Sequence, residues 1–315
     1  MLAHQDPSQV VRLADALRAR QPTAEVAVAY NGPLEHAESD DLIAAGVRRV
    51  GSGHRARWGE FSIVERTLEG LADIDGDRSV VLISADSHPT PHLGAWVRTF
   101  AASGSHVALH GSEVVGNQML DAQVGHRWHL WHQPRSDAGR ALFRVTNVIG
   151  GWLGRRERVR VSPRVVAIAG RRRAVPPRYA KGDQWFAISP EGRARLQVRM
   201  ADPLLRDLFA RTLIPDEFLF HTVALLDGWR IWQSKLMFLA WPYSGAPNPR
   251  HLGLDDLPAV LEASTPFARK LRGPSGEELA RALDQLPDRQ LAPALDGPLV
   301  QGASGAPDGA ADDER

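Results

Sequence analysis

The sequence predicts an α/β protein in which a Rossmann-like, mixed but mostly parallel sheet is flanked by helices. Short apolar, β-branched runs at 25–30 and 79–84 are typical of buried strands, and segments with helical periodicity alternate with them. This alternation is characteristic of layered α/β domains. Because ligands of such sheets bind beyond the carboxyl ends of the strands, we expect the site near the loops at 31–33 and 85–89.

The other elements follow in chain order. Asp6 or Ser8 is suited to cap the first helix, and Pro215 with two acids after it is suited to begin another. We expect helices at 10–17, 40–45, 61–71, 92–102, from 190, at 203–211, from 215 and at 276–286. We expect strands at 25–30, 47–50, 79–84 and 236–241, and a turn that leads into a strand at 181–189.

Two regions are expected along the chain. Residues 1–272 form the predicted catalytic domain, with a first strand that is truncated because it begins almost at Met1. Residues 273–315 are expected to be a helix plus a disordered tail, since 8 of the 29 residues from Pro287 onward are Pro or Gly and none is aromatic.

Composition excludes several classes of protein. The chain has 38 Lys+Arg against 37 Asp+Glu, so no overall charge excess points to nucleic acid. It has no cysteine, which excludes disulfides, thiolate metal sites and cysteine nucleophiles. We expect a cytoplasmic protein. A local run of eight arginines at Arg155–Arg173 is either a solvated face or a surface for anionic lipid or a phosphorylated substrate, which allows peripheral attachment to the inner face of the membrane.

Two patterns resemble known sites without their context. The Gly51–Ala56 segment fits a dinucleotide fingerprint, but the next helix is expected only after Trp58. His126, His129 and His132 are spaced unlike a helical zinc site, and a wall of Trp and His is the preferred interpretation.

Several segments carry a resemblance to a known family. They are Trp58-Gly59-Glu60-Phe61-Ser62-Ile63-Val64-Glu65, Leu82-Ile83-Ser84-Ala85-Asp86-Ser87-His88-Pro89, Gly182-Asp183-Gln184-Trp185-Phe186, Pro215-Asp216-Glu217-Phe218-Leu219-Phe220-His221-Thr222, Trp241-Pro242-Tyr243 and Pro266-Phe267-Ala268-Arg269-Lys270-Leu271. In their order and spacing, over about residues 1–272, they resemble the bacterial form of the Core-2/I-branching β-1,6-N-acetylglucosaminyltransferase family.

The resemblance implies a GT-A glycosyltransferase fold, a UDP-sugar donor (typically UDP-N-acetylglucosamine), a glycan or glycoconjugate acceptor, inversion at the anomeric carbon and no divalent metal. Glu217 matches the general base, and Lys270 matches the basic residue on the diphosphate, with Arg250 as a second choice. Trp241 and Tyr243 resemble the aromatic pair at the acceptor. Four further residues are assigned to the site: Asn31 and Asp86 on the donor, and Asp216 and Trp185 on substrate.

The chain also departs from the family pattern. Ser87 stands where the family has an acid, with Asp86 before it, and Asn31 ends a segment that usually ends in Asp. Asp86-Ser87-His88 also mimics a metal motif, so a metal-assisted variant is an alternative. The departures motivate a second hypothesis, an inactive sugar-nucleotide-binding or scaffold protein on the same fold. Nucleic-acid binding through Arg155–Arg173 is a weaker third, and no nucleic-acid partner is expected.

Overall fold

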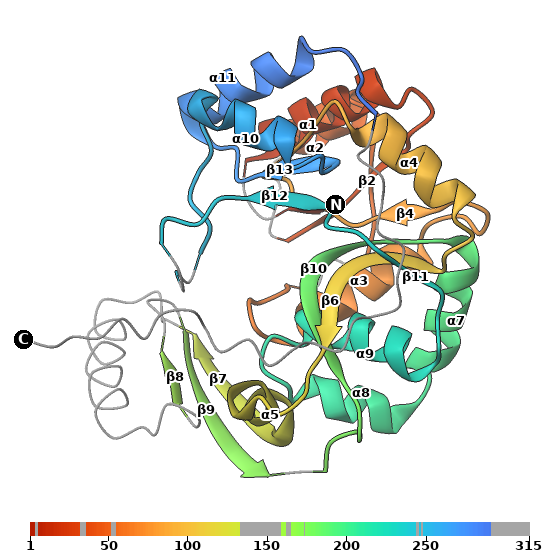
Figure 1. Ribbon diagram of the computed structural model, residues 1–315, viewed down its shortest axis with the longest axis vertical. Helices are drawn as coiled ribbons and strands as arrows, with labels where there is room; N and C mark the ends of the chain where they lie inside the picture. Colours follow the sequence, from red (N-terminus) through yellow and green to blue (C-terminus); the bar gives the residue numbers. More distant parts are fainter. Residues whose placement is uncertain are drawn as a thin grey trace, which may run out of the picture.

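A computed structural model of the chain describes residues 1–3, 6–31, 36–51, 55–132, 159–161, 165–172, 174–243, 246 and 248–290. Over these residues the protein is mixed α/β with four small sheets, which confirms the α/β prediction (Figure 1). Five of the eight arginines of the run Arg155–Arg173 and the tail from residue 291 onward lie outside the described residues. None of the described helices combines the length and the apolar character that crossing a bilayer requires.

The first sheet is parallel and lies in the N-terminal part of the chain. Its strands, in the order β1-β2-β3, are β1 (Leu2–Ala3), β2 (Val26–Tyr30) and β3 (Val47–Arg49). The helices along this part of the chain are α1 (Pro7–Arg20), α2 (His36–Ala44) and α3 (Ser62–Ala72). Asp6 caps α1 by accepting a hydrogen bond from the amide of Gln9, and Pro7 occupies the first turn, where no amide donor is needed.

The second sheet is mixed, and backbone hydrogen bonds join it to the first. In the order β11-β6-β10-β4, it contains β4 (Val80–Val81), β6 (Val107–Glu113), β10 (Ala180–Ile188) and β11 (Ile231–Gln233). Leu2 donates its amide hydrogen to Ile83 and accepts one from Ala85, while Leu82 donates to Phe186 on β10. Backbone pairing therefore continues from β3 through β1 and residues 82–85 to β11.

The prediction of one mostly parallel sheet needs correction. β10 pairs antiparallel with both β4 and β6, and the described strands divide into several small sheets instead of one. The local alternation of strands and helices does not determine how strands pair. It therefore does not reveal that β10 lies between β4 and β6, two strands formed earlier in the chain, and runs antiparallel to both.

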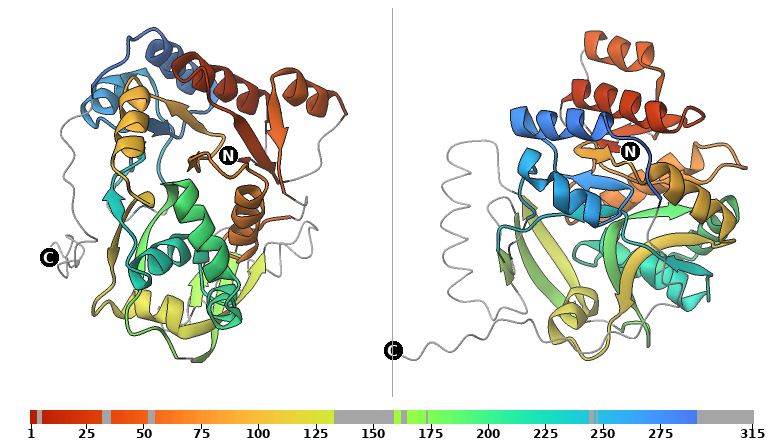
Figure 2. Two further views of the ribbon diagram at one scale, coloured as in Figure 1. Left: turned by 90° about the vertical axis from the view of Figure 1, so that its right-hand side faces the viewer. Right: turned by 45° about the horizontal axis from the view of Figure 1, so that its top comes forward.

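The third sheet carries the C-terminal part of the chain. Its strands, in the order β12-β13-β5, are β5 (Ser87–Pro89), β12 (Met237–Leu239) and β13 (Phe267–Arg269). The accompanying helices are α4 (Leu93–Ala102), η2 (Leu254–Asp256), α10 (Leu257–Glu262) and α11 (Gly273–Asp284). Helix α11 lies beside α1 in both views of Figure 2, and Leu279 and Leu283 on it are fully buried. The helix predicted at 276–286 is therefore present and packs on the rest of the fold, while the boundary predicted at 272 stays a prediction.

The fourth sheet is antiparallel. Its strands, in the order β7-β9-β8, are β7 (His126–His132), β8 (Val159–Val161) and β9 (Val165–Arg172), and α5 (Gln118–Gly125) precedes it. Part of the basic run therefore lies on β8 and β9. The three histidines of β7 do not converge on one site: His132 pairs with Glu60 at 2.7 Å, while His129 is exposed.

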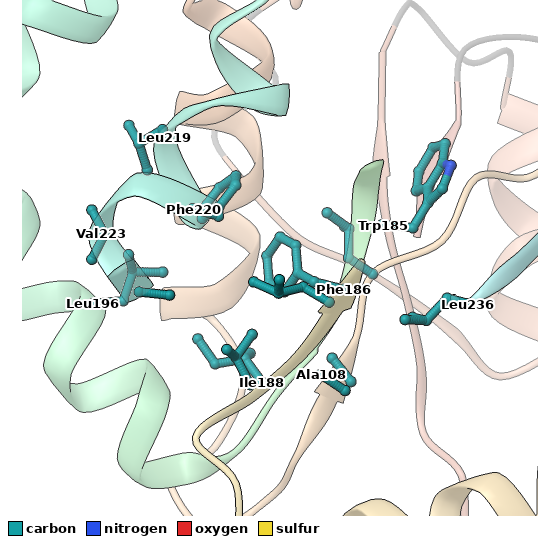
Figure 3. Packing of buried hydrophobic residues seen from close by; sticks show 14 of the residues in the cluster. Ala108, Trp185, Phe186, Ile188, Leu196, Leu219, Phe220, Val223 and Leu236 are labelled. Atoms are coloured by element: carbon teal, nitrogen blue, oxygen red, sulfur yellow. The ribbon is translucent and has the colours of Figure 1, made fainter. Parts of the chain in front are cut away.

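The main core lies between the second sheet and the helices that follow β10. These are α7 (Pro190–Met200), α8 (Pro203–Ala210), the short 3₁₀ turn η1 (Pro215–Glu217) and α9 (Leu219–Leu226). The ring of Phe186 on β10 packs against Phe220 on α9 with 4.6 Å between centroids, and Ile188 and Leu196 extend this contact (Figure 3). Trp185 points to the opposite side of the strand from Phe186, so the indole ring of Trp185 does not join this contact (Figure 3).

Candidate functional site

The carboxyl ends of β1, β2 and residues 82–85 lie together at one edge of the sheet. β1 pairs with β2 on one side and with residues 82–85 on the other. The chain therefore continues from β1 to one side of it and later returns to add residues 82–85 on its other side. Open α/β sheets bind ligands at such a switch point. Asn31 follows β2 and Asp86 follows residues 82–85, so both lie where the sequence predicted a site.

Asp86 is a buried anchor for two arginines. Only 4% of the residue is exposed. Its Oδ1 accepts hydrogen bonds from the Ser84 hydroxyl at 2.6 Å and from Nε of Arg269 at 2.8 Å, and its Oδ2 lies 3.2 Å from Nη2 of Arg272. Burial alone would raise the pKa of Asp86, but Arg269, Ser84 and Arg272 outweigh it and hold that pKa below its usual value. Asp86 therefore organises cations and is not displayed toward a ligand.

The chain next to Asp86 concentrates positive charge. The amide of Leu271 donates to the backbone oxygen of Asp86 at 2.9 Å, so residues 269–272 wrap around this loop. Arg269 and Arg272 thus share a single buried carboxylate, and Lys270 lies between them in the chain. A preorganised group of cations in a partly buried position is suited to bind a phosphate or diphosphate.

Trp185 lies under the Arg269 guanidinium. The centre of the guanidinium is 5.1 Å from the centroid of the indole ring, a cation–π distance. Because Trp185 is buried, its role in the structure is to support Arg269. The sequence had assigned it to direct contact with substrate.

Glu217 lies in η1 with its carboxylate on a lysine. Oε2 of Glu217 is 2.5 Å from Nζ of Lys181 on β10, and both side chains are about one-third exposed (32% and 28%). The neighbouring Asp216 is buried, and its Oδ1 has no hydrogen-bond partner within the described part of the chain. Burial, and secondly the charge of Glu217, raise the pKa of Asp216 to about 7. The two adjacent carboxyls thus occupy different environments, and Glu217 is the accessible one.

The turn that presents Glu217 is strained and braced. Ile214 has φ of 56°, a left-handed conformation that a β-branched residue rarely adopts, and Pro215 follows it. The amide of Ile214 donates to the carbonyl of Gly59 at 3.1 Å, so the loop at 58–60 holds the entry to the turn. Two segments that carry the family resemblance are thereby brought into contact. Strained backbone of this kind concentrates at functional sites.

The strand β10 connects the two groups of residues. Lys181 near its start contacts Glu217, and Trp185 four residues later supports Arg269. At about 3.3 Å per residue the two positions are at most ~13 Å apart along the strand. A register shift between Gly182 and Phe186 lies between them. Bulges of this kind often re-aim side chains near active sites.

A buried histidine lies behind this part of β10. Gly111 on β6 and Gly182 on β10 pair directly, and a Cβ on either would collide with the ring of His221 from α9. His221 is completely buried, and this burial lowers its pKa to about 4. In front of it, His110 pairs with Asp183 at 3.3 Å.

The structure gives other predicted site residues different partners. Asn31 exchanges two hydrogen bonds with the backbone of Ala56 at 2.7 and 2.8 Å, which ties the end of β2 to the next loop. Arg250 forms a bidentate pair with Asp256 at 2.8 and 2.5 Å. Both residues are therefore already engaged in the fold.

The predicted acceptor aromatics lie on the loop after β12. Trp241 is 50% exposed and Tyr243 is 64% exposed, so both present open rings. Asp216, which was assigned to the substrate, is buried. His88, the last residue of the possible metal motif, pairs with Asp284 at 2.9 Å and not with Asp86. Among the described residues no group of three or more potential His, Asp or Glu ligands gathers around a metal position.

Sequence reasoning missed Lys181, Arg269 and Arg272. Arg269 lies inside a segment that carries the resemblance, and the density of basic residues at 269–272 was a usable signal. Lys181 had a weaker one, its position directly before the Gly182-Asp183 turn. No protein-family model matches the chain, and no curated protein matches its sequence. The functional assignment therefore depends on the geometry of these residues and on the resemblance.

Proposed function

We propose that the protein is an inverting glycosyltransferase of GT-A-like fold. It transfers a sugar, N-acetylglucosamine in the first instance, from a UDP-sugar to a hydroxyl of a glycan or glycoconjugate, with a β-1,6 linkage as the expected product. The observation that carries the proposal is the pairing of an accessible carboxylate with a group of cations along β10. Glu217 lies at one end, and Arg269 with its neighbours lies at the other.

This arrangement supplies what an inverting transfer needs. As the acceptor oxygen attacks the anomeric carbon, Glu217 takes the hydroxyl proton, and the bond from that carbon to the diphosphate oxygen breaks. The electron pair leaves with the diphosphate, and Lys270 with Arg269 stabilises the developing negative charge. Trp241 and Tyr243 offer aromatic faces to the acceptor sugar. In this mechanism Asp86 acts through the arginines that it anchors.

The strand arrangement supports the finer fold proposal. The order β3-β2-β1 followed by residues 82–85 also occurs in nucleotide-binding α/β sheets, where a switch point lies beside the first strand. The resemblance to the Core-2/I-branching family supports the same fold. Attachment to an anionic membrane through Arg155–Arg173 stays a prediction, because five of the eight arginines of that run lie outside the described residues.

A non-catalytic sugar-nucleotide-binding protein is the second candidate. The observation in its favour is that the two positions where the family has acids are used internally. Asn31 is bonded to the backbone of Ala56, and the Ser87 hydroxyl lies 3.1 Å from that of Ser84. Such a protein would bind the donor and release no UDP with any glycan acceptor.

The test combines binding with turnover. Sugar nucleotides are screened by thermal shift with and without manganese, and UDP release is then measured with glycan acceptors. We expect UDP-N-acetylglucosamine to raise the melting temperature of the wild-type protein and of Glu217→Gln equally. Glu217→Gln should lower turnover by about 10²–10⁴-fold, since it removes the proton acceptor.

The exposed Glu262→Gln is the matched control and should keep wild-type turnover. If Glu217→Gln also keeps it, Glu217 is not the base. If the wild-type protein binds the donor but transfers to no acceptor, the second candidate replaces the first. Activity that is lost in EDTA and restored by manganese would contradict the expected metal independence.

A further inference from the structure

Lys181 is held more firmly than a surface lysine. It lies on β10 and pairs with Ser112 of β6, just before the shift in strand register between Gly182 and Phe186. Its ammonium lies 2.5 Å from Oε2 of Glu217 and 5.7 Å from the ring centroid of Phe218. A side chain on a paired strand, with an anion and an aromatic face as neighbours, has few alternative positions.

We propose that Lys181 is the positioning residue of the general base and holds the carboxylate of Glu217 in the orientation that receives the acceptor proton. The inference depends on the proposed function, since it assigns the partner of the proposed base. The turn η1 fixes the backbone of Glu217 through the hydrogen bond from Ile214 to Gly59. Lys181 fixes the carboxylate, which the turn alone leaves free to rotate.

The charges around Glu217 explain why it needs this cation. Asp216 is adjacent in the chain and buried, and Asp183 lies two residues beyond Lys181 on the same strand. His110 faces Asp183, and His221 is buried behind the strand. Asp183 already has His110 as its partner, which leaves Lys181 as the cation paired with Glu217 in this group. Without it, two neighbouring carboxyls would share a partly buried site with no cation on Glu217.

Because the chain contains few lysines, the surroundings of Lys181 can be observed separately from those of the others. The chain contains three lysines, Lys181, Lys235 and Lys270, against 35 arginines. Two of the three lie in the proposed site. An ammonium is a compact point charge, whereas the wider fork of arginine binds a carboxylate with different geometry. Reductive methylation with ¹³C-formaldehyde therefore yields only three lysine signals besides that of the N-terminus.

The first experiment reads the contact directly by NMR of the ¹³C-methylated full-length protein. Each lysine signal is assigned by its Lys→Arg variant. We expect the Lys181 signal to move in Glu217→Gln and the signal of the exposed Lys235 to stay unchanged. An unmoved Lys181 signal overturns the inference, whether or not the protein is an enzyme, and this measurement needs no Lys181→Met protein.

The second experiment reads the consequence by steady-state kinetics of Lys181→Met, Lys181→Arg and the control Lys235→Met. For Lys181→Met we expect kcat to fall at least about tenfold while KM for the donor stays within about twofold. Lys181→Arg should restore part of kcat, since it returns the positive charge in a different shape.

The outcomes separate the two proposals. If Glu217→Gln abolishes transfer but Lys181→Met keeps the wild-type kcat, the positioning role is wrong and the proposed function stands. If Glu217→Gln has no effect on turnover, the proposed function itself is wrong. A Lys181→Met protein that loses kcat with no rescue by Lys181→Arg, or whose donor KM changes along with kcat, indicates a purely structural role and also overturns the inference.

Discussion

Asp216 and Glu217 are neighbours in the chain, yet the fold gives them opposite environments. Glu217 reaches partly exposed space and a lysine, whereas Asp216 is turned into the protein. Adjacent carboxyls whose environments differ in this way are a common arrangement at sites of proton transfer, because one stays available while the other is held neutral. The burial of Asp216 therefore has a cost that depends on pH.

The pH dependence of stability tests this environment in Asp216→Asn. The pKa of Asp216 is about 7 in the folded protein and near 3.8 in the unfolded chain, so between these values the folded state holds the extra proton. Stability from this group is therefore present below about pH 4 and is lost as pH rises toward 7. We expect the free energy of unfolding of the variant, relative to wild type, to rise by up to about 4 kcal/mol between pH 4 and pH 8.

Urea unfolding of both proteins at several pH values checks this, with the exposed Asp255→Asn as the control. A difference between Asp216→Asn and wild type that stays constant with pH would show that Asp216 is ionised in the folded protein. The test uses only how the difference in free energy of unfolding changes with pH. A constant effect of the new amide group on that free energy therefore does not alter the result.

Local patterns predicted some site residues and misjudged others. Glu217 stood out as an acid at an expected helix start, and Lys270 was assigned through the resemblance. Lys181 did not, because its partner is 36 residues away in sequence and only the fold joins them. Asp86 was predicted to contact the donor, but the two arginines that occupy it come from the other end of the chain. Contacts between residues that are far apart in the sequence produce no periodic pattern in it, so they could not be predicted from local patterns.

At the scale of elements, β6, β10 and α9 meet through a pair of glycines. Gly111 and Gly182 pair across the two strands, and the ring of His221 lies where their side chains would be. Glycine weakens a strand interior, so two facing glycines indicate a close approach of another group. The close approach brings α9, and η1 before it, against the strand that carries Lys181.

Gly182→Ala tests this close packing. A Cβ at this position would lie closer than 3.0 Å to the carbonyl oxygen of His110 and to Nε2 of His221, distances that real contacts do not adopt. Because both neighbours are buried or part of the strand, we expect the free energy of unfolding to fall by about 1–3 kcal/mol or more. Gly76→Ala is the control, since nothing lies within 4 Å of its Cβ.

Chemical denaturation of both variants measures the effect. Equal stability of Gly182→Ala and Gly76→Ala would mean that α9 can move away from the strand at little cost. In that case the position of Glu217 would also be less fixed than the structure indicates.

Elements with strong local periodicity were predictable, and strand pairing was not. The helices near 61–71, 92–102 and 276–286 appear as α3, α4 and α11 because each buries one face of a 3.6-residue repeat. The strand expected at 236–241 shortens to β12 (Met237–Leu239), and the helix expected from Pro215 begins as a 3₁₀ turn. Strand length and direction depend on partners far away in sequence, so local patterns do not determine them.

At the scale of the whole molecule, helix α11 packs against helix α1 near the start of the chain. Leu279 and Leu283 of α11 are buried together with Leu252, Val260, Ala268 and Leu271. From α1, Arg20 donates to the backbone oxygen of Leu283 at 2.5 Å and pairs with Asp288 at 3.0 Å. Because Ala268 lies on β13, directly before Arg269 and Lys270, α11 also supports the strand that carries the cations of the proposed site.

Leu283→Ala tests whether α11 and residues 1–272 unfold together. A fully buried leucine replaced by alanine costs about 2–5 kcal/mol, through lost burial and the cavity that remains. All nine tryptophans lie between Trp58 and Trp241, so tryptophan fluorescence reports only on the part of the chain before α11. We expect the fluorescence-monitored urea transition of Leu283→Ala to move to lower urea by the full amount, while Leu204→Ala, at an 81% exposed position, leaves it unchanged. A fluorescence transition that stays at the wild-type urea concentration, while circular dichroism shows early loss of helix, would mean that α11 unfolds separately and that a boundary near residue 272 is real.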